Sequence, residues 1–462
     1  MSPRPRARFA DDPLGVLVDA AANGGGVAPF RIGPVPAVVV SAPPVMREVL
    51  VERPEDFPKG SRQLSALRPV LGYGLLTSDR ELHTRQRRMV QPSFVPARID
   101  PYVDDIVDET LTALRKWPRG ELDVVPLVNS LAMDIVGRML FGRSMQDEGK
   151  LADAIRVAFE WEMRALTSSV PLPAWLPTRS NRRMRAAVAA VDARLGELAH
   201  TDPGVLADGR ATLLHRLLDS RDSDGLPMPR DQLLDEVRTI WGAAHETSAD
   251  AQIWCLDLVS RHPEVQARLA DEAQAAFSTA GRDRDWLDQV PYALQVFKEA
   301  MRLYPPASAM LRTSRGSTSL DGVRLRPGTL VFLSPYVMHR RADLFPQPHR
   351  FDPDRFGPQR EPTIPRHAYL PFGAGRRVCI GSYLALLEGQ VLTALMTHRL
   401  RIEPTTPCPP REELVINLRP SGPVRLRLTD RAPATEGSCP HQPAPVRAVR
   451  PRVAAQPCNR EG

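Results

Sequence analysis

Apolar and polar residues alternate with a helical period through most of the chain between about residues 80 and 305. The clearest case runs from about Arg230 to Arg261, where apolar positions recur every three or four residues until His262-Pro263. At 1.5 Å per residue, this segment predicts one helix of roughly 45 Å, long enough to cross a domain. Its middle is therefore expected to be buried.

Two shorter stretches have patterns that are typical of strands. Between about residues 28 and 60, short apolar runs such as 37–40 alternate with proline and glycine, which indicates a small sheet. After residue 305, Asp321-Gly322 and Pro327-Gly328 are hairpin signals beside the short runs 323–325 and 330–333. Residues from about 340 to 371 are rich in proline and are expected to be irregular.

These patterns predict a mainly α protein with small β-sheets. The 462 residues suit one catalytic domain over residues 13–430, between Pro/Arg-rich ends at 1–12 and 431–462 that lack a period. Such ends are expected to be disordered. Because no apolar run reaches about 18 residues, we expect no membrane-spanning segment and a cytoplasmic monomer.

The composition narrows the classes of partner. The formal net charge is +7, nearly all the positive charge is arginine, and lysine occurs only four times. The basic residues are spread along amphipathic segments and aromatic residues make up 6% of the chain, which argues against nucleic-acid binding. A basic patch for an acidic electron-transfer protein is compatible with this charge. The five cysteines show no disulfide, zinc or c-type haem spacing, as expected in a reducing compartment.

Residues 372–381 place Cys379 in a glycine-rich loop just before a segment, from Ile380 to about Met396, that predicts a helix. A helix N-terminus favours a thiolate, and glycines permit tight turns and a close approach of the backbone to a flat ligand. The loop therefore suits a single thiolate ligand of iron. The alternative interpretation is a buried free cysteine in a glycine-rich turn.

The loop resembles the haem loop of the cytochromes P-450, the haem-thiolate monooxygenases, in five residues at matching spacings: Phe372, Gly373, Arg377, Cys379 and Gly381. The resemblance implies the fold of that family, with haem b between the long central helix and this loop. It implies that Cys379 is the axial iron ligand, and a thiolate ligand favours O–O cleavage. It also implies that Phe372, Gly373 and Gly381 lie around the cofactor.

The resemblance extends to residues that would bind the two haem propionates. His83 and Arg87 lie four residues apart in a predicted helix and match the bacterial form of the family's propionate pattern. Arg312 and Arg377 match further propionate ligands, each able to form a charge-assisted hydrogen bond. Without the other motifs, His83 would equally well be a solvated helix residue.

The middle of the long helix reads Gly-Ala-Ala-His-Glu-Thr-Ser over residues 242–248 and resembles the oxygen-activation motif of the family. The resemblance implies that Ala243 lies over the haem, Thr247 hydrogen-bonds at the oxygen site and Glu246 relays protons through water. Ala244 stands where the family has glycine, so its methyl group narrows the oxygen groove. Taken alone, Glu246-Thr247 is more typical of a solvated helix edge.

A third group of residues is predicted to stabilise the fold and to take no part in the chemistry. Glu299 and Arg302 lie three residues apart in a helix predicted from Val290 to Leu303, and an isolated pair of this kind is worth under about 1 kcal/mol. Arg355 follows in the segment 351–356 at the distance at which the family adds a second arginine to this pair. The resemblance implies a buried network of the three side chains that fixes the irregular region before Cys379.

The motifs together predict a monooxygenase that inserts one oxygen atom from dioxygen into a hydrophobic small molecule by hydroxylation or epoxidation. We expect a terpenoid substrate, with a polyketide or fatty-acyl substrate as the alternative. The predicted pocket walls are 64–76, 166–177, Ala243 and 307–311. By resemblance, electrons come from NAD(P)H through a ferredoxin reductase and a ferredoxin that docks near Arg85, Arg88 and Arg376.

Two other functions are compatible with a haem site. The first is a haem-thiolate enzyme that uses peroxide or isomerises its substrate, which Glu246-Thr247 disfavour because such enzymes typically lack the acid-alcohol pair. The second is a haem sensor or binding protein, in which a proton relay would serve no purpose.

Overall fold

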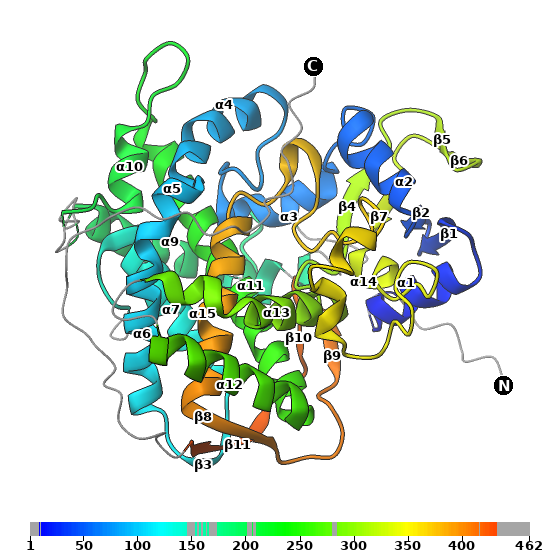
Figure 1. Ribbon diagram of the computed structural model, residues 1–462. Helices are drawn as coiled ribbons and strands as arrows, with labels where there is room; N and C mark the ends of the chain where they lie inside the picture. The colour runs from blue at the N-terminus through cyan, green and yellow to red at the C-terminus, as the bar shows by residue number, and fades with distance from the viewer. Residues whose placement is uncertain are drawn as a thin grey trace.

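A computed structural model describes residue 9 and residues 11–431, apart from gaps at 146–152, 155, 156, 159, 163, 166–172, 201–205, 207, 208, 280–283 and 415. The tail from 432 and most of the segment 1–12 lie outside the described residues, so the two disordered ends stay predictions. Most helices gather in one region, and the sheet formed by the first strands lies beside them with α1, α2 and α14 (Figure 1).

The described residues form these α-helices: α1 (Pro13–Ala22), α2 (Pro43–Arg47), α3 (Ser61–Leu71), α4 (Arg80–Val90), α5 (Pro96–Ile99), α6 (Val103–Lys116), α7 (Val125–Phe141), α9 (Arg179–His200), α10 (Leu213–Asp219), α11 (Arg230–Arg261), α12 (Pro263–Thr279), α13 (Pro291–Leu303), α14 (Pro335–Met338) and α15 (Ser382–Arg399). The bounds predicted for α11 are confirmed, and α13 begins one residue after the predicted Val290. Proline at or near the first helical position starts several of these helices, since its missing N–H would have no partner there.

The largest sheet contains β1 (Val27–Ile32), β2 (Val35–Val40), β7 (Leu330–Leu333) and β4 (Met310–Thr313), in the order β1-β2-β7-β4. Strand β2 is antiparallel to β1 and parallel to β7, which is antiparallel to β4. The prediction of strands between residues 28 and 60 is wrong beyond Val40, because the chain turns helical at Pro43. In the run 43–52, apolar and polar residues come in blocks, and the run is too short for a helical period to be recognised.

The smaller sheets pair β5 (Thr318–Leu320) with β6 (Val323–Leu325), β9 (Glu412–Leu414) with β10 (Leu418–Pro420), and β11 (Arg425–Asp430) with both β3 (Gly120–Asp123) and β8 (Leu400–Pro404). The hairpin predicted at Asp321-Gly322 is the β5–β6 turn. The one predicted at Pro327-Gly328 is wrong, since β7 pairs with β2 and β4 and not with β6. Three of the four β7 residues are buried, so this apolar strand lies in the interior of the larger sheet.

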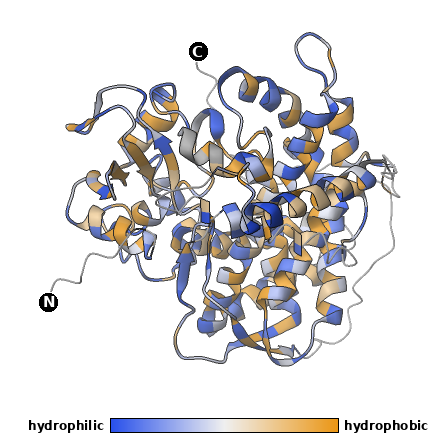
Figure 2. Cartoon of the chain, turned by 180° about the vertical axis from the view of Figure 1, so that it is seen from behind, coloured by the Kyte–Doolittle hydropathy of each residue, from blue (hydrophilic) through white to orange (hydrophobic). Residues whose placement is uncertain are grey.

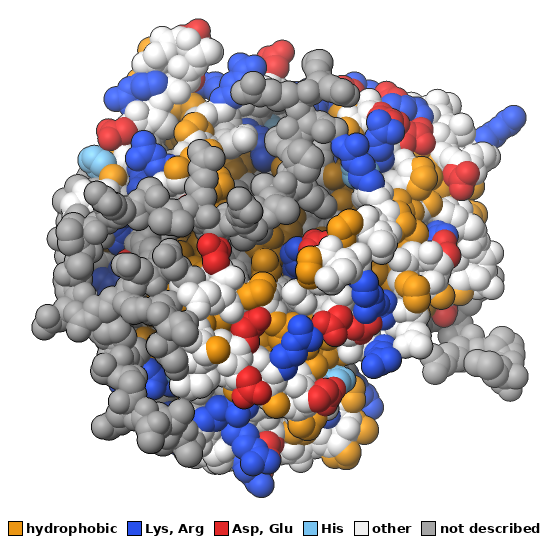
Figure 3. Space-filling view, viewed as in Figure 1, with side chains coloured by type: hydrophobic (Ala, Val, Ile, Leu, Met, Phe, Trp, Pro, Cys, Tyr) orange, Lys and Arg blue, Asp and Glu red, His pale blue; other side chains and the backbone are white. Residues whose placement is uncertain are grey.

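The core is built around α11, which packs on α7, α13 and α15. Trp241 and Trp254 of α11 are among the largest fully buried side chains. Both apolar and polar colours run along most helices in Figure 2, as expected for helices that bury one face. Acidic and basic side chains are interspersed on the face seen in Figure 3. Within the described part of the chain, no helix is both long and apolar enough to cross a membrane.

The predicted irregular region before the cysteine is held by buried ion pairs. Arg302 donates from Nε and Nη2 to the two carboxylate oxygens of Glu299, at 2.7 and 2.8 Å, and Arg355 Nε lies 3.4 Å from Glu299 Oε1. Arg302 also donates to the backbone carbonyls of residues 339, 348 and 350. The network therefore ties α13 to the chain that leads into the Cys379 loop.

Candidate active site

The Cys379 loop is a compact turn that ends at the start of α15. A 3-10 turn over Gly375–Arg377 precedes Cys379, and the Cys379 amide donates to the Phe372 carbonyl at 2.9 Å. The Cys379 side chain has accessible surface, but protein surrounds it closely enough that burial raises the pKa of its thiol. The side chain therefore borders a space inside the fold and not the outer surface. A hydrogen bond from the Gly381 amide and the charge of Arg87 oppose this pKa rise.

Glycine is required at one position of the loop and not at another. Gly375 has φ +71°, and a Cβ there would lie 2.1 Å from the carbonyl oxygen of Leu50. Gly381, at the N-cap of α15, has φ −89°, and a Cβ there would meet no protein atom within 4 Å. The packing of the protein thus explains Gly375, whereas at Gly381 it leaves room for a ligand.

Beside the loop, four basic side chains from distant segments face one another. His83 of α4, Arg312 of β4 and Arg377 line one small cavity of about 50 Å³, and Lys59 lies within electrostatic reach of all three. Burial, followed by the charges of Arg377 and Lys59, lowers the pKa of His83 to about 3. Burial and Arg377 also lower the pKa of Arg312 to about 10.

Asp79 is the carboxylate that these cations share. It accepts a hydrogen bond from Arg377 Nη2 at 2.5 Å. Arg312, in contrast, donates only to the carbonyl of its neighbour Leu311 and has no ion-pair partner among the described residues. The sequence reasoning missed Lys59 and Asp79. The scarcity of lysine in this chain was the available signal for Lys59, whereas Asp79 had none.

The residues present fit a ligand that carries carboxylates. Arg312 is buried, Lys59 and Arg377 are partly buried, and these three cations share the carboxylate of Asp79, so positive charge is left uncompensated in a poorly solvated place, which is costly. The propionates of a haem would supply the missing negative charge, and its metal would hold the Cys379 sulfur as thiolate. Arg87, expected among the propionate ligands, also donates to the Val378 carbonyl at 2.8 Å and so braces the loop.

The middle of α11 has small and polar side chains that border open space, as the Cys379 side chain does. Ala243 is exposed although Gly242 is buried, so α11 borders open space at this point. The Thr247 hydroxyl donates to the Ala243 carbonyl at 2.7 Å. Burial raises the pKa of Glu246 to about 7, against the opposing charge of Arg419. His245 lies on the buried side of α11, with its Nδ1 3.0 Å from the Trp241 carbonyl oxygen.

A further acid that the sequence reasoning missed connects α11 with the helix after the cysteine. Glu388 of α15 is buried and accepts a hydrogen bond from Ser248 at 3.1 Å, while its other oxygen has no partner within the part of the chain that the structure describes. Burial raises its pKa to about 7. The helical position after Cys379 indicated only a core residue, so no pattern singled Glu388 out.

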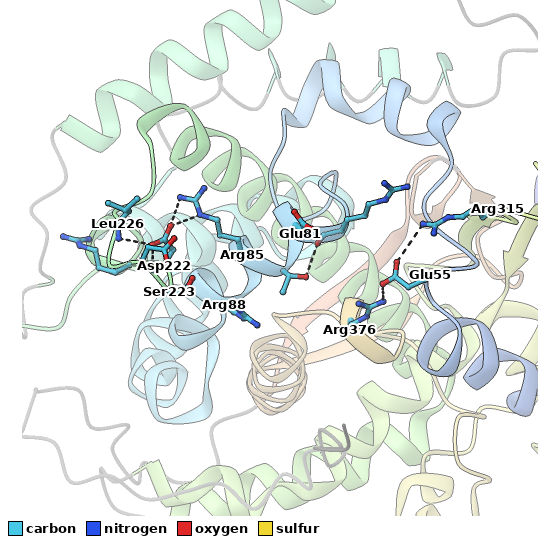
Figure 4. A pocket seen from close by; sticks show the side chains of 13 residues that line it. Glu55, Glu81, Arg85, Arg88, Asp222, Ser223, Leu226, Arg315 and Arg376 are labelled. Atoms are coloured by element: carbon cyan, nitrogen blue, oxygen red, sulfur yellow. Dashed lines mark hydrogen bonds and ion pairs between the residues drawn. The ribbon is translucent and has the colours of Figure 1, made fainter.

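Next to the small cavity lined by His83, Arg312 and Arg377 is a surface hollow of about 1010 Å³, which is lined by Arg85, Arg88 and Arg376 among others (Figure 4). Arg85 pairs with Asp222 at 2.9 Å, and Arg376 pairs with Glu55. Arg88 is exposed and has no ion-pair partner within the described part of the chain. Because Arg376 belongs to the Cys379 loop, this hollow lies next to the cysteine site.

Comparison with known proteins agrees with this geometry. The sequence model of the cytochrome P450 family matches residues 7–427. The chain is 33% identical to cyclooctatin synthase of Streptomyces melanosporofaciens over 430 residues, which are 90% of this chain and 91% of that protein. It is 32% identical to pentalenene oxygenase of Streptomyces avermitilis over 427 residues, 91% of this chain and 94% of that protein.

The fold is also found in solved structures. A crystal structure of a cytochrome P450 superposes with a TM-score of 0.82 at 22% identity and covers 93% of this chain and all of that one. Mostly helical architecture with small sheets is thus shared, as predicted. By the family match over nearly its whole length, this chain belongs to the cytochrome P450 family and is a monooxygenase with a haem-iron cofactor.

Proposed function

We propose that Cys379 binds the iron of haem b and that the enzyme oxygenates a hydrophobic small molecule. The observation that carries the proposal is the open surface of Cys379 beside Arg312, a buried cation with no ion-pair partner among the described residues. When bound, the haem supplies activation of dioxygen, from which one atom enters a C–H or C=C bond of the substrate. Phe372 and Gly373 belong to the turn that holds the sulfur, and Gly381 donates its N–H to it.

In this proposal His83, Arg87, Arg312 and Arg377 hold the two propionates, joined by Lys59. Arg312 supports the assignment most directly, because it is buried with only one backbone hydrogen bond. Arg377 now binds Asp79, so a propionate would join or replace that carboxylate. Charge-assisted hydrogen bonds of this kind orient a ligand as well as bind it.

On α11, Glu246 and Thr247 transfer protons next to Ala243. A carboxyl group whose pKa is about 7 is near half-protonated at neutral pH, so Glu246 can both give and take a proton. The Thr247 hydroxyl donates to the Ala243 carbonyl, so its lone pairs remain free to accept a proton or a hydrogen bond. This pair disfavours an enzyme that only uses peroxide or isomerises its substrate.

Electrons reach the site, we infer, from a ferredoxin that binds at the hollow of Figure 4. The arginines that line the hollow outnumber its acids, and one of them belongs to the Cys379 loop. An acidic iron–sulfur protein would complement this surface and dock close to the cofactor. A ferredoxin reductase with NAD(P)H completes the chain of electron transfer.

The proposed substrate is a terpenoid. Relatives of this chain are named for the oxygenation of pentalenene and of cyclooctat-9-en-7-ol, the latter 31% identical over 396 residues. The predicted wall 64–76 includes the buried residues Leu64, Leu67 and Val70, and 166–177 lies largely outside the described residues. A panel of terpenoid, polyketide and fatty-acyl compounds tests the choice, since a type I spectral shift with fatty acids alone would refute it.

The spectrum of the carbonyl complex tests the haem assignment. The reduced protein with carbon monoxide is expected to show the red-shifted Soret band of a thiolate-ligated haem. The Cys379→Ser variant is expected to lose this band, whereas Cys408→Ser, at another exposed cysteine, is expected to keep it. An unchanged band in Cys379→Ser would contradict the assignment. Product formation with reductase, ferredoxin and NAD(P)H, compared with peroxide alone, then separates the two kinds of haem-thiolate enzyme.

A further inference from the structure

One face of α11 carries a row of groups that starts at Glu246 and ends under a hairpin. Glu246, Asp250 and Trp254 are spaced four residues apart, so they share this face. Trp254 donates from its indole nitrogen to the Leu418 carbonyl at 3.2 Å, which fixes the β9–β10 hairpin over the row. Asp250 is 9% exposed and is hydrogen-bonded to the side chain of Asn417 from the same hairpin.

The hairpin also brings a cation to the solvent end of the row. Arg419 is half exposed, pairs with Glu413 at 3.1 Å, and lies within electrostatic reach of both Asp250 and Glu246. Burial raises the pKa of Asp250 well above its usual range, and the charge of Arg419 opposes that rise. The row thus leads from a solvated ion pair, through Asn417 and Asp250, to Glu246.

A third buried acid approaches Glu246 from another helical segment. Glu162 is fully buried, and among the described residues neither of its carboxyl oxygens has a hydrogen-bond partner. Burial and the charge of Glu246 raise its pKa well above the usual value. Since Glu162 has no exposed surface of its own, it adds no second opening to solvent.

We propose that protons reach Glu246 from solvent through Asp250, along the face of α11 that the β9–β10 hairpin covers. Asp250 is then a positioning residue that acts through Glu246, and the inference rests on the proposed role of Glu246. Each turnover uses two electrons from the redox partner and two protons to give oxygenated product and water. Asp250 passes its proton towards Glu246 and takes up another from solvent beside Arg419. Because this step moves only protons, it needs no further oxidant or reductant.

Two matched variants test the route. Asp250→Asn and Glu162→Gln each replace a buried acid near Glu246 by its neutral isostere, and asparagine can still pair with Asn417. With reductase and ferredoxin, we expect Asp250→Asn to lower product formed per NAD(P)H by about 5-fold or more, with more peroxide released and a larger solvent isotope effect. Glu162→Gln should behave like the wild type, and both should keep peroxide-driven turnover.

A readout independent of turnover is the infrared carbonyl band of protonated carboxyl groups in the purified haem protein. Asp250→Asn should remove one titrating band. Arg419→Gln should shift the midpoint of that band to higher pH, because it removes a charge that lowers the pKa of Asp250. Arg419 lies at the surface, so its replacement is not expected to unfold the protein.

The outcomes separate this inference from the proposed function. Wild-type coupling and isotope effect in Asp250→Asn, or an equal loss in Glu162→Gln, would overturn the route. An absent band, or one that Arg419→Gln leaves in place, would also overturn it. If the wild type itself forms no product from dioxygen, the proposed function fails, while the infrared titration still decides whether Asp250 exchanges protons under the hairpin.

Discussion

The two glycines on either side of Cys379 differ in what they contribute. Gly375 is fixed by a left-handed backbone and by the nearby Leu50 carbonyl, so it shapes the protein itself. Gly381 has an ordinary φ and free space beside it, so its small size serves a neighbour that is not part of the chain. The same residue type thus has two separable roles within one loop.

This difference predicts opposite results for two alanine substitutions. Gly375→Ala should lower the free energy of unfolding by about 2–4 kcal/mol, because of backbone strain and overlap with Leu50. Gly381→Ala should lower it by less than about 1 kcal/mol, the cost of a poorer N-cap, but should speed haem loss. Urea unfolding and haem transfer to a scavenger protein measure the two effects. Equal destabilisation by both substitutions would contradict the assignment.

The buried cations make a second prediction for a single residue. Arg312→Met should speed haem loss by about 10-fold or more, because a charge-assisted hydrogen bond is worth about 1.5–3 kcal/mol. The fold should tolerate the change, since no carboxylate among the described residues forms an ion pair with Arg312 and would be left unpaired. Arg324→Met, at an exposed position of β6, is the control and should not alter haem loss. Haem retention like that of the wild type would show that Arg312 does not bind a propionate.

At this scale the sequence predicts residues whose spacing is local and misses those that the fold assembles. Cys379, Glu246 and Thr247 stand in short motifs, so their neighbours along the chain identify them. Lys59 and Glu388 reach the site from separate segments and carry no local pattern. Burial, which no single position reveals, is what makes their charge unusual.

The ion-pair network is a property of elements, because it joins α13 to the irregular chain before the cysteine. Glu299 accepts hydrogen bonds from Arg302 and the Asp352 amide and forms an ion pair with Arg355, and both Glu299 and Arg302 are fully buried. Removing one member leaves the other charges in a poorly solvated site, which costs more than the pair itself contributes.

Glu299→Gln is therefore expected to lower the free energy of unfolding by about 3–5 kcal/mol. The control is Glu361→Gln, which breaks a pair with Lys298 at 2.6 Å on a partly exposed carboxylate and should cost less than about 1 kcal/mol. Denaturant unfolding of both purified proteins gives the comparison. A loss of similar size in the two variants would mean that burial of Glu299 has little energetic weight.

Elements with long, regular patterns were predicted well, and those defined by their partners were not. The period of α11 extends over 32 residues, and its bounds matched the structure. Strand β7 has four residues, and the turn before it suggested a hairpin with β6. Its pairing with β2, about 290 residues earlier in the chain, depends on contacts that local turn chemistry does not encode.

For the whole molecule, the net charge of +7 bears on partner binding only through the places where the charged side chains lie. Acidic and basic groups are interspersed on the face seen in Figure 3, yet arginines from α4 and the Cys379 loop line one hollow. Within that hollow, Arg85 and Arg376 are partly neutralised by Asp222 and Glu55. Arg88 is exposed without such a partner, so it presents its full charge to an approaching protein.

Reversal of the Arg88 charge should weaken binding of the redox partner and leave the rest of the enzyme unchanged. Arg88→Glu is expected to raise the KM for an acidic ferredoxin by about 10-fold at low salt, and the difference should shrink as screening increases. Arg427→Glu makes the same change at an exposed position of β11, in a different sheet, and should leave this KM unchanged. Peroxide-driven turnover should be equal in both variants, because it needs no electron donor. A KM for ferredoxin that does not respond to salt or to Arg88→Glu would place the docking surface elsewhere.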